Sequence, residues 1–421
     1  MAKIKPFKAV IYNQQKINDL SSVICPPYDV ISLSQQEQYH NIDPHNFIHI
    51  LLGKNISGDD KYKRSKKYFK EWQDEKILIQ EEKPSVYFYS QQYNIKGEKR
   101  TRLGFICLLS LGDSKEPVFG HEHTRLEPKE DRLRLLKSVK ANLSPIFVIF
   151  SDRKRLIQRI SQQFNNEKPF LEAKDQEENL HKIWKIDSPE AIARIQADMQ
   201  EADIFIADGH HRYEVSCAYR SEMKRKLGEG EAAEKFNYIL AYFTHIESRG
   251  LAILPIHRLV KLKKKIDLSN LKASLKNYFE IDEVKDKERF FFLMEKAARH
   301  VLGMYKDKRY FLLRLKNLRI LDKMIEDKPP EYRALDVCAL NYIILKKTLG
   351  FSLDEKNNIT FSPYADELLA QVNSDDSYIA FFLNPVGVKQ ITAIALKREK
   401  MPPKSTFFYP KVASGLLINK F

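Results

Sequence analysis

The segment 204–214, which reads IFIADGHHRYE, limits the possible folds of this chain more than any other segment. Its apolar start predicts a buried strand, and the Asp208-Gly209 pair that follows predicts a turn. Residues 214–227 have the pattern of a helix. The strand therefore passes almost directly into a helix N-terminus. The turn between them carries three polar side chains, which are those of His210, His211 and Arg212.

This turn favours the binding of an anion. The first N–H groups of a helix lack partners inside it, and the helix dipole adds positive potential. Gly209 lets a ligand approach the backbone, and the Arg212 guanidinium suits a phosphate or carboxylate. The structural alternative is an ordinary capped helix, with Asp208 as the N-cap and both histidines facing solvent. We favour the functional interpretation, because little in a fold requires two consecutive histidines at a helix start.

Composition and charge narrow the class of protein. The chain has 421 residues, of which 43% are hydrophobic, so we expect a globular protein of about two structural units. The net charge of +15 suits nucleic acid, but lysines mix with glutamates along segments such as 61–83, which is typical of solvated helix faces. Nucleic acid is therefore not the favoured partner. No apolar run has the length of a membrane span and no signal-peptide core is present, so we expect a cytoplasmic protein without a membrane.

Strands and helices mix along the chain without strict alternation, which predicts an α+β fold. We expect a catalytic-like core at residues 1–262, a small inserted α/β unit at 263–330, and a segment at 331–421 that returns to the core. Four distant cysteines indicate neither a disulfide framework nor a zinc site. The expected elements include a hairpin of 86–93 and 99–110, strands at 45–50 and 392–396, and a long amphipathic helix at 332–349.

A second polar motif, His121-Glu122-His123, lies between the hairpin and a helix. Alternate side chains of an extended segment share one face, so the two histidines can hold a metal ion together. A third ligand is missing nearby, so the motif is not a complete metal site. We expect all three residues to be functional.

Three further segments carry chemistry. Lys404 with the hydroxyls that follow it, Ser405 and Thr406, suits a phosphate, although a proline turn entering a strand is the alternative. Asp29 follows a rigid Pro-Pro turn and could act as a base or a magnesium ligand, or simply cap its own turn. The basic pair His257-Arg258 lies at the end of a predicted strand, and an ordinary surface position is the structural alternative to a functional role.

Taken together, these motifs resemble the bacterial and archaeal family catalogued as domain of unknown function 1015. The resemblance runs nearly end to end, and the family has no firmly established activity. It rests on residues 26–31, 45–48, 121–124, 142–147, 208–213, 254–258 and 401–411.

A more distant resemblance concerns the Asp208–Arg212 turn alone. It is similar to the Gly-x-x-Arg signature of the ParB/sulfiredoxin-like fold, where it lies at a helix N-terminus and holds nucleotide phosphates. That superfamily includes nucleotide-hydrolysing ParB, sulfiredoxin and free-serine kinases, in which an acidic residue of an early loop is the base. The resemblance implies a mixed-sheet core of this type, and it makes Asp29 or Glu122 the counterpart of that base.

The hypothesis that follows is a phosphoryl-transfer enzyme, a small-molecule kinase or nucleotide hydrolase, that binds ATP or ADP with Mg²⁺ and acts on a small anionic or hydroxylated metabolite. The alternatives are a ParB-like nucleic-acid-binding protein or nuclease, and a metal-dependent hydrolase. We expect the motifs to line one cleft, with 404–406 folded onto the Asp208–Arg212 turn. The predicted catalytic residues are Asp29, Glu122, His123, Asp208 and His210; the predicted phosphate ligands are Gly209, His210, His211, Arg212, Lys404, Ser405, Thr406 and His121; the predicted metal ligands are Asp29 and Glu122.

Overall fold

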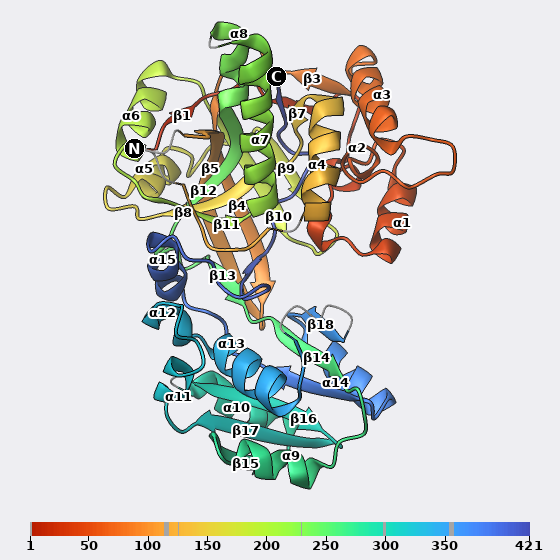
Figure 1. The fold of residues 1–421 in the computed structure, drawn as a ribbon. Helices are drawn as coiled ribbons and strands as arrows, with labels where there is room; N and C mark the ends of the chain where they lie inside the picture. The colour runs from red at the N-terminus through yellow and green to blue at the C-terminus, as the bar shows by residue number, and fades with distance from the viewer. Residues whose placement is uncertain (1, 113–117, 125, 229, 298–299, 353–357) are drawn as a thin grey trace. The chain divides into compact units, whose positions relative to one another are not determined.

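The computed structural model describes residues 2–112, 118–124, 126–228, 230–297, 300–352 and 358–421 (Figure 1). The chain forms two compact units. Unit 1 comprises Met1–Gly120, Thr124–Ala252 and Pro410–Phe421, and unit 2 comprises His121–His123 and Ile253–Tyr409. Each unit combines helices with a β-sheet, as expected for the α+β class. The predicted division at residues 262 and 330 stays a prediction.

The main sheet of unit 1 is mixed. Only the β11–β6 and β12–β8 pairs are parallel among its described strands. The expected hairpin is present as β4 and β5, and its turn has left-handed residues at Lys96 and Gly97, which suit a tight hairpin. The strand order is β6 (Val118–Gly120), β11 (Ile204–Asp208), β8 (Ile146–Phe150), β12 (Tyr238–His245), β5 (Glu98–Ser110), β4 (Val86–Ile95), β10 (Leu180–Ile186) and β9 (Leu171–Lys174), with β1 (Ile4–Lys5) also paired to β5.

Side-chain alternation along these strands builds two different faces. One face is apolar and packs against α5 (Leu156–Gln163) and α6 (Pro189–Met199), with Val148 and Phe243 in the shared core. The helices α4 (Leu126–Val139) and α7 (His210–Leu227) lie side by side (Figure 1). The remaining elements of unit 1 are β2 (Val10–Tyr12), η1 (Leu20–Ser22), η2 (Tyr28–Val30), α1 (Leu33–Ile42), α2 (Ile48–Leu51), α3 (Lys61–Asp74), β3 (Leu78–Gln80), β7 (Ala141–Asn142), α8 (Glu231–Glu234), η3 (Lys235–Asn237) and β21 (Asn419–Lys420).

The main sheet of unit 2 pairs its described strands antiparallel throughout. Its order is β15 (Phe279–Val284), β17 (Arg309–Leu315), β16 (Val301–Lys306), β19 (Tyr378–Phe382), β14 (His257–Lys261) and β18 (Ile359–Ser362). Phe290, Leu368 and Phe382 belong to its core. The other elements are β13 (Ala252–Leu254), α9 (Leu268–Leu275), α10 (Lys287–Lys296), α11 (Arg319–Asp322), α12 (Pro330–Arg333), α13 (Asp336–Cys338), the π-helix η4 (Ala339–Thr348), α14 (Ala365–Ser374), α15 (Val388–Leu396) and β20 (Phe407–Tyr409).

Three elements predicted from the sequence differ from those in the structure. The predicted strand at 45–50 is the short helix α2, whose start is fixed because the Asn46 side chain accepts a hydrogen bond from Ile48 N at 3.0 Å. The predicted strand at 392–396 is the second half of the helix α15, at whose start the Gln390 side chain accepts a hydrogen bond from Gly387 N at 3.1 Å. The predicted helix at 332–349 is broken between α12 and α13 and then becomes π-helical, with five-residue hydrogen bonds such as Leu349 N to Ile344 O.

Among the described residues, the helices that are long enough to span a membrane lack the apolar character to do so.

Candidate functional site

The turn that joins β11 to α7 differs from the predicted one in where the helix begins and in which residue is its N-cap. The helix begins four residues earlier than predicted, at His210, and Gly209 is its N-cap with φ of 90°. No side chain caps this end of the helix, so Asp208 is not the N-cap. His210 is buried and His211 half-buried, which also differs from the solvent-facing histidines of the capped-helix alternative.

Asp208 instead binds two cations. Its Oδ2 accepts a hydrogen bond from Arg212 Nη2 at 2.7 Å, and its Oδ1 accepts one from Lys411 Nζ. Burial acts to raise the pKa of Asp208, but Lys411 and Arg212 outweigh burial and hold that pKa well below its usual range. The carboxylate therefore stays ionised at neutral pH. This state favours a role in orienting the two cations over a role as proton acceptor.

Arg212 is fixed from several sides. Its Nη1 donates to the Pro145 carbonyl oxygen, in addition to the Nη2 bond with Asp208. Its guanidinium also lies against Gly209, where an added Cβ would come within 3.1 Å of Cζ. Glycine is needed here for two reasons, the positive φ and this close approach.

Lys411 is a site residue that sequence reasoning missed. It lies at the end of the 401–411 motif, but the prediction placed the basic contact at Lys404. The main chain around Lys411 is held in unit 1 by two hydrogen bonds from the sheet. Gln91 Nε2 donates to Lys411 O at 2.9 Å, and the fully buried Arg102 donates to Pro410 O at 2.7 Å.

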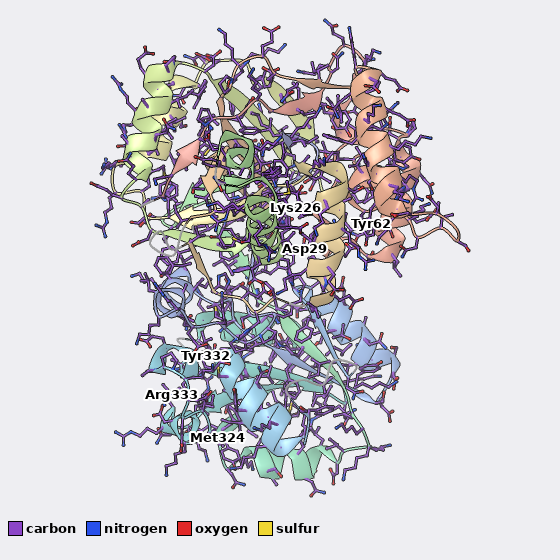
Figure 2. All side chains as sticks on the ribbon, turned by 45° about the horizontal axis from the view of Figure 1, so that its top comes forward. Asp29, Tyr62, Lys226, Met324, Tyr332 and Arg333 are labelled. Atoms are coloured by element: carbon purple, nitrogen blue, oxygen red, sulfur yellow. The ribbon has the colours of Figure 1, made fainter. Side chains whose placement is uncertain are left out.

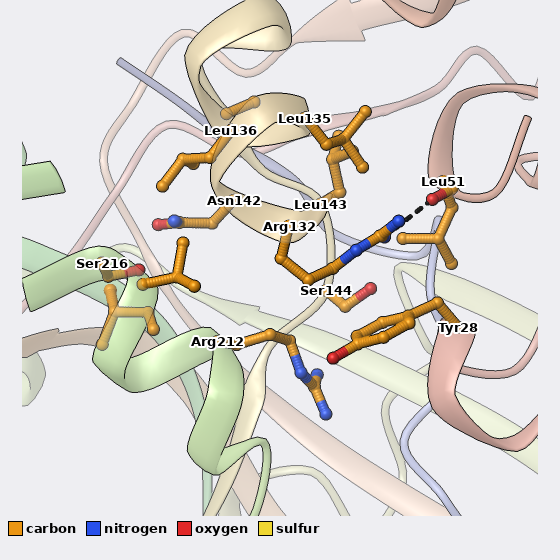
Figure 3. Close-up of a pocket in the computed structure, with 13 residues that line it drawn as sticks. Tyr28, Leu51, Arg132, Leu135, Leu136, Asn142, Leu143, Ser144, Arg212 and Ser216 are labelled. Atoms are coloured by element: carbon orange, nitrogen blue, oxygen red, sulfur yellow. Dashed lines mark hydrogen bonds between the residues drawn. The ribbon is translucent and has the colours of Figure 1, made fainter. Parts of the chain in front are cut away.

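A cavity of about 60 Å³ adjoins this turn in unit 1. Two arginines, Arg132 of α4 and Arg212 of α7, line it together with Tyr28 of η2. The Arg132 guanidinium lies 4.2 Å from the centre of the Tyr28 ring and donates to Leu51 O at 2.9 Å. Figure 3 shows the Tyr28 hydroxyl directed toward Arg212. The other lining residues are Leu51, Leu135, Leu136, Ala141, Asn142, Leu143, Ser144, Val215, Ser216 and Ile239.

Burial and neighbouring charges fix the protonation states of Tyr28 and of Asp131, the carboxylate that holds Arg132. Burial raises the pKa of the Tyr28 hydroxyl, so it remains a neutral donor. Burial would also raise the pKa of Asp131, but the Arg132 guanidinium and hydrogen bonds from Lys61 and Tyr62 lower that pKa to about 2. Arg132 is therefore held by a permanently charged carboxylate, as Arg212 is by Asp208.

Asp29 follows Tyr28 in η2 and is exposed (Figure 2). The structure thus brings Tyr28, rather than Asp29, into the cavity. Six predicted site residues belong to unit 1: Asp29, Asp208, Gly209, His210, His211 and Arg212.

The other predicted residues form a second cluster, in unit 2. His121 is buried, its Nε2 lies 3.1 Å from Thr406 Oγ1, and its carbonyl oxygen accepts from Met401 N at 2.8 Å. Arg258 donates to the Lys404 carbonyl oxygen at 2.9 Å. The motifs 121–123, 257–258 and 401–406 therefore meet. Within this cluster Glu122 and Ser405 are half-buried, and His123 and Lys404 are exposed.

His257 and Arg258 do not take the surface position that was the structural alternative for this pair. Both are at most 5% exposed, because β14 is an inner strand between β19 and β18. The idea that both clusters line one cleft stays a prediction. Across the described residues, no three His, Cys, Asp or Glu side chains gather as metal ligands.

Comparisons with solved structures found several weak likenesses. A conserved hypothetical protein from Pyrococcus furiosus is 12% identical with a TM-score of 0.33, covering 72% of this chain and 90% of that one. A free serine kinase in complex with AMP is 12% identical with a TM-score of 0.32, covering 72% and 86%. C-terminally truncated SbnI from Staphylococcus aureus is 10% identical with a TM-score of 0.36, covering 75% and 87%. TM-scores this low transfer no function.

A search of curated proteins found no match. A family model described as a protein of unknown function, DUF1015, matches residues 4–338, which is most of the chain. This match spans the Asp208–Arg212 turn, the His121–His123 motif and the buried His257-Arg258 pair. The chain therefore belongs to the DUF1015 family.

Proposed function

We propose that this protein binds a nucleotide through its phosphates and transfers a phosphoryl group to a small hydroxylated metabolite. One observation carries the proposal: the cavity beside the first turn of α7 is lined by two arginines, and the helix end next to it is capped by glycine rather than by a side chain. Helix N-termini and arginine forks are the two protein groups that suit phosphate best.

The phosphate site that we propose consists of the α7 N-terminus and the guanidinium of Arg212. Asp208 and Pro145 fix that guanidinium in place, so little side-chain entropy is lost when a phosphate binds. Lys411 adds a second cation beside Asp208. His210 and His211, in the first turn, complete the proposed set. Phosphoryl transfer needs such positioning and positive charge more than covalent chemistry.

Asp29 is the base that we propose for the acceptor hydroxyl. It is an exposed carboxylate next to Tyr28, whose ring lines the cavity. When bound, Mg²⁺ would neutralise the nucleotide phosphates, and it commonly takes only one or two protein carboxylates. Asp29 fits that requirement in unit 1. Glu122, which lies in unit 2, stays a proposed ligand or base, and Lys404, Ser405, Thr406, His121 and His123 stay proposed site residues. A ParB/sulfiredoxin-like arrangement around the α7 turn is part of this proposal.

The test is a binding titration with ATP and ADP, with and without Mg²⁺, followed by ³¹P NMR of reactions with small hydroxylated acceptors. R212Q should weaken nucleotide binding at least tenfold, since it removes the charged fork. R225Q is the matched control, because Arg225 is an exposed arginine in the last turn of the same helix. D29N should keep nucleotide affinity and lose phosphoryl transfer.

Equal nucleotide affinity in R212Q and R225Q would refute the proposed phosphate site. Tight binding of DNA or RNA with steep salt dependence, and no nucleotide binding, would favour the ParB-like nucleic-acid-binding alternative instead.

A further inference from the structure

Arg258 is a buried cation that forms no ion pair with a carboxylate among the described residues of unit 2. It is 1% exposed and lies on β14. Its donors reach only carbonyl oxygens, those of Ile256, Pro403 and Lys404. No carboxylate of the described residues forms an ion pair with it. A buried charge without a charged partner costs several kcal/mol, so such residues usually meet an anion.

The groups around Arg258 do not supply that anion. Its neighbour His257 is buried, and burial and Arg258 lower the pKa of His257 to about 3, so this imidazole is neutral. The ring of Phe361 lies 4.9 Å below the guanidinium and offers only a cation–π contact. Burial lowers the pKa of Arg258 itself to about 9, which still leaves it charged at neutral pH.

The guanidinium borders a small cavity in unit 2. The cavity has a volume of about 20 Å³, which exceeds the roughly 10–15 Å³ that one water-sized group needs. Gln390, Asn384 and Ser405 supply polar side chains to its wall. The Ser405 hydroxyl donates to Pro402 O, and Asn384 Nδ2 donates to Met294 O at 2.8 Å. Asp336 also lines it, but Asp336 Oδ1 lies 3.0 Å from the backbone N of His300 and 3.2 Å from its Nδ1.

The loop at 403–404, whose carbonyl oxygens accept hydrogen bonds from Arg258, has a strained backbone at Lys404. Lys404 has a φ of +58°, which is unusual for a residue with a side chain, and Arg258 binds its carbonyl oxygen. An uncompensated buried charge and a strained loop are two separate costs. Costs of this kind concentrate at ligand-binding sites, where binding repays them.

We infer that Arg258 is the centre of an oxyanion site in unit 2, separate from the α7 turn. Its ligand is a carboxylate or phosphoryl oxygen of a small molecule, which enters the cavity beside Ser405 and neutralises the guanidinium. The size of the cavity admits one oxygen of such a terminal group and not a whole nucleotide. The predicted phosphate role of the 404–406 motif thereby passes from the exposed Lys404 to Arg258, and Ser405 takes part when its hydroxyl turns from Pro402 O to the ligand.

The test measures thermal unfolding of the full chain by calorimetry, in buffers titrated with inorganic phosphate or acetate. R258M keeps the apolar stem and removes the charge. R309M is the matched control, because it removes an arginine of unit 2 whose side chain is 46% exposed. S405A removes a polar group from the cavity wall while keeping Arg258, and it tests the site even where R258M does not fold.

The unmodified protein and R309M should gain an upward shift of the unfolding temperature on the order of 3 °C that saturates with anion concentration. Saturation separates binding from the general stabilising effect of phosphate, which does not saturate. In the R212Q background, where the α7 turn no longer contributes, R258M should abolish the shift, and S405A should need at least about fivefold more anion for half of it. A larger response to phosphate than to acetate assigns a phosphoryl ligand, and the reverse a carboxylate.

Three results would overturn the inference. One is the absence of a saturable shift in the unmodified protein. Another is an equal shift in R258M, or in S405A if R258M is unfolded. The third is a shift that R212Q abolishes and R258M retains, since it would place the anion at the α7 turn of unit 1.

Discussion

Replacing Asp208 by asparagine should destabilise unit 1 strongly. D208N keeps the size of the side chain and removes the charge that Arg212 and Lys411 share. The three side chains are between 12% and 14% exposed, so water cannot replace the lost partner. Each hydrogen bond to a charged group contributes about 1.5–3 kcal/mol, and breaking a buried ion pair costs about 3–5 kcal/mol. We expect a loss of about 3–5 kcal/mol for D208N.

The loss should be smaller for K411M, because Asp208 keeps Arg212 as a partner. We expect about 1.5–3 kcal/mol for this variant. The double variant D208N/K411M should lose less than the sum of the two, since the lysine no longer faces an amide. The coupling energy of the cycle should be about 1–3 kcal/mol.

Urea unfolding followed by tryptophan fluorescence isolates unit 1. The chain has two tryptophans, and both Trp72 and Trp184 belong to unit 1. With an m-value of about 3 kcal/mol/M, D208N should lower the urea midpoint by about 1–1.7 M. E178Q is the control, because Glu178 pairs with Lys174 at the surface and its side chain is 77% exposed. It should change stability by less than about 0.5 kcal/mol.

A D208N midpoint within about 0.3 M of the unmodified protein, or strict additivity in the cycle, would refute this reasoning. Either result would mean that Asp208 contributes little to holding the two cations.

Three further predictions follow from the same structure. G209A should cost about 1–3 kcal/mol in the urea assay, because φ is +90° and the new Cβ would meet Ile146 at 3.0 Å; an unchanged midpoint would contradict the close packing at this turn. The pKa of His257 is about 3 when folded and near 6.5 when unfolded, so unit 2 should lose about 1.4 kcal/mol per pH unit as the pH falls from about 6 to 4. The stability of unit 2 can be followed by hydrogen exchange of β14 amides. H257N should remove this pH dependence, and a pH dependence that persists in H257N would mean that another group causes it. The pKa of Asp131 is lowered to about 2, so its stabilising effect is complete above pH 4 and is lost as the pH falls from about 4 to 2. D131N should lower stability at pH 7 and flatten this acid limb in the urea assay, whereas an unchanged limb would contradict the paired state.

Local patterns in the sequence located the α7 turn. The apolar run 204–207 predicted a buried strand and the Asp208-Gly209 pair predicted a turn at its end, although the helix begins four residues earlier than predicted. The same reasoning found the β4–β5 hairpin. It failed where side chains of other segments or a cap decided the backbone. Asn46, for example, lies two residues before α2. Its side-chain oxygen accepts a hydrogen bond from Ile48 N, and its amide nitrogen donates to Ser22 O at 2.6 Å.

The tertiary structure alone decided which residues share a site. Asp208 and Lys411 are 203 residues apart, and no local pattern reports a contact at that distance. The motifs of the sequence fall in two units: 121–123 and 401–406 belong to unit 2, whereas 208–212 and Lys411 belong to unit 1. The burial of Arg258 likewise depends on the tertiary structure. Sequence shows a basic residue at the end of a strand, but only the order of strands shows that this strand is internal and that its charge is buried.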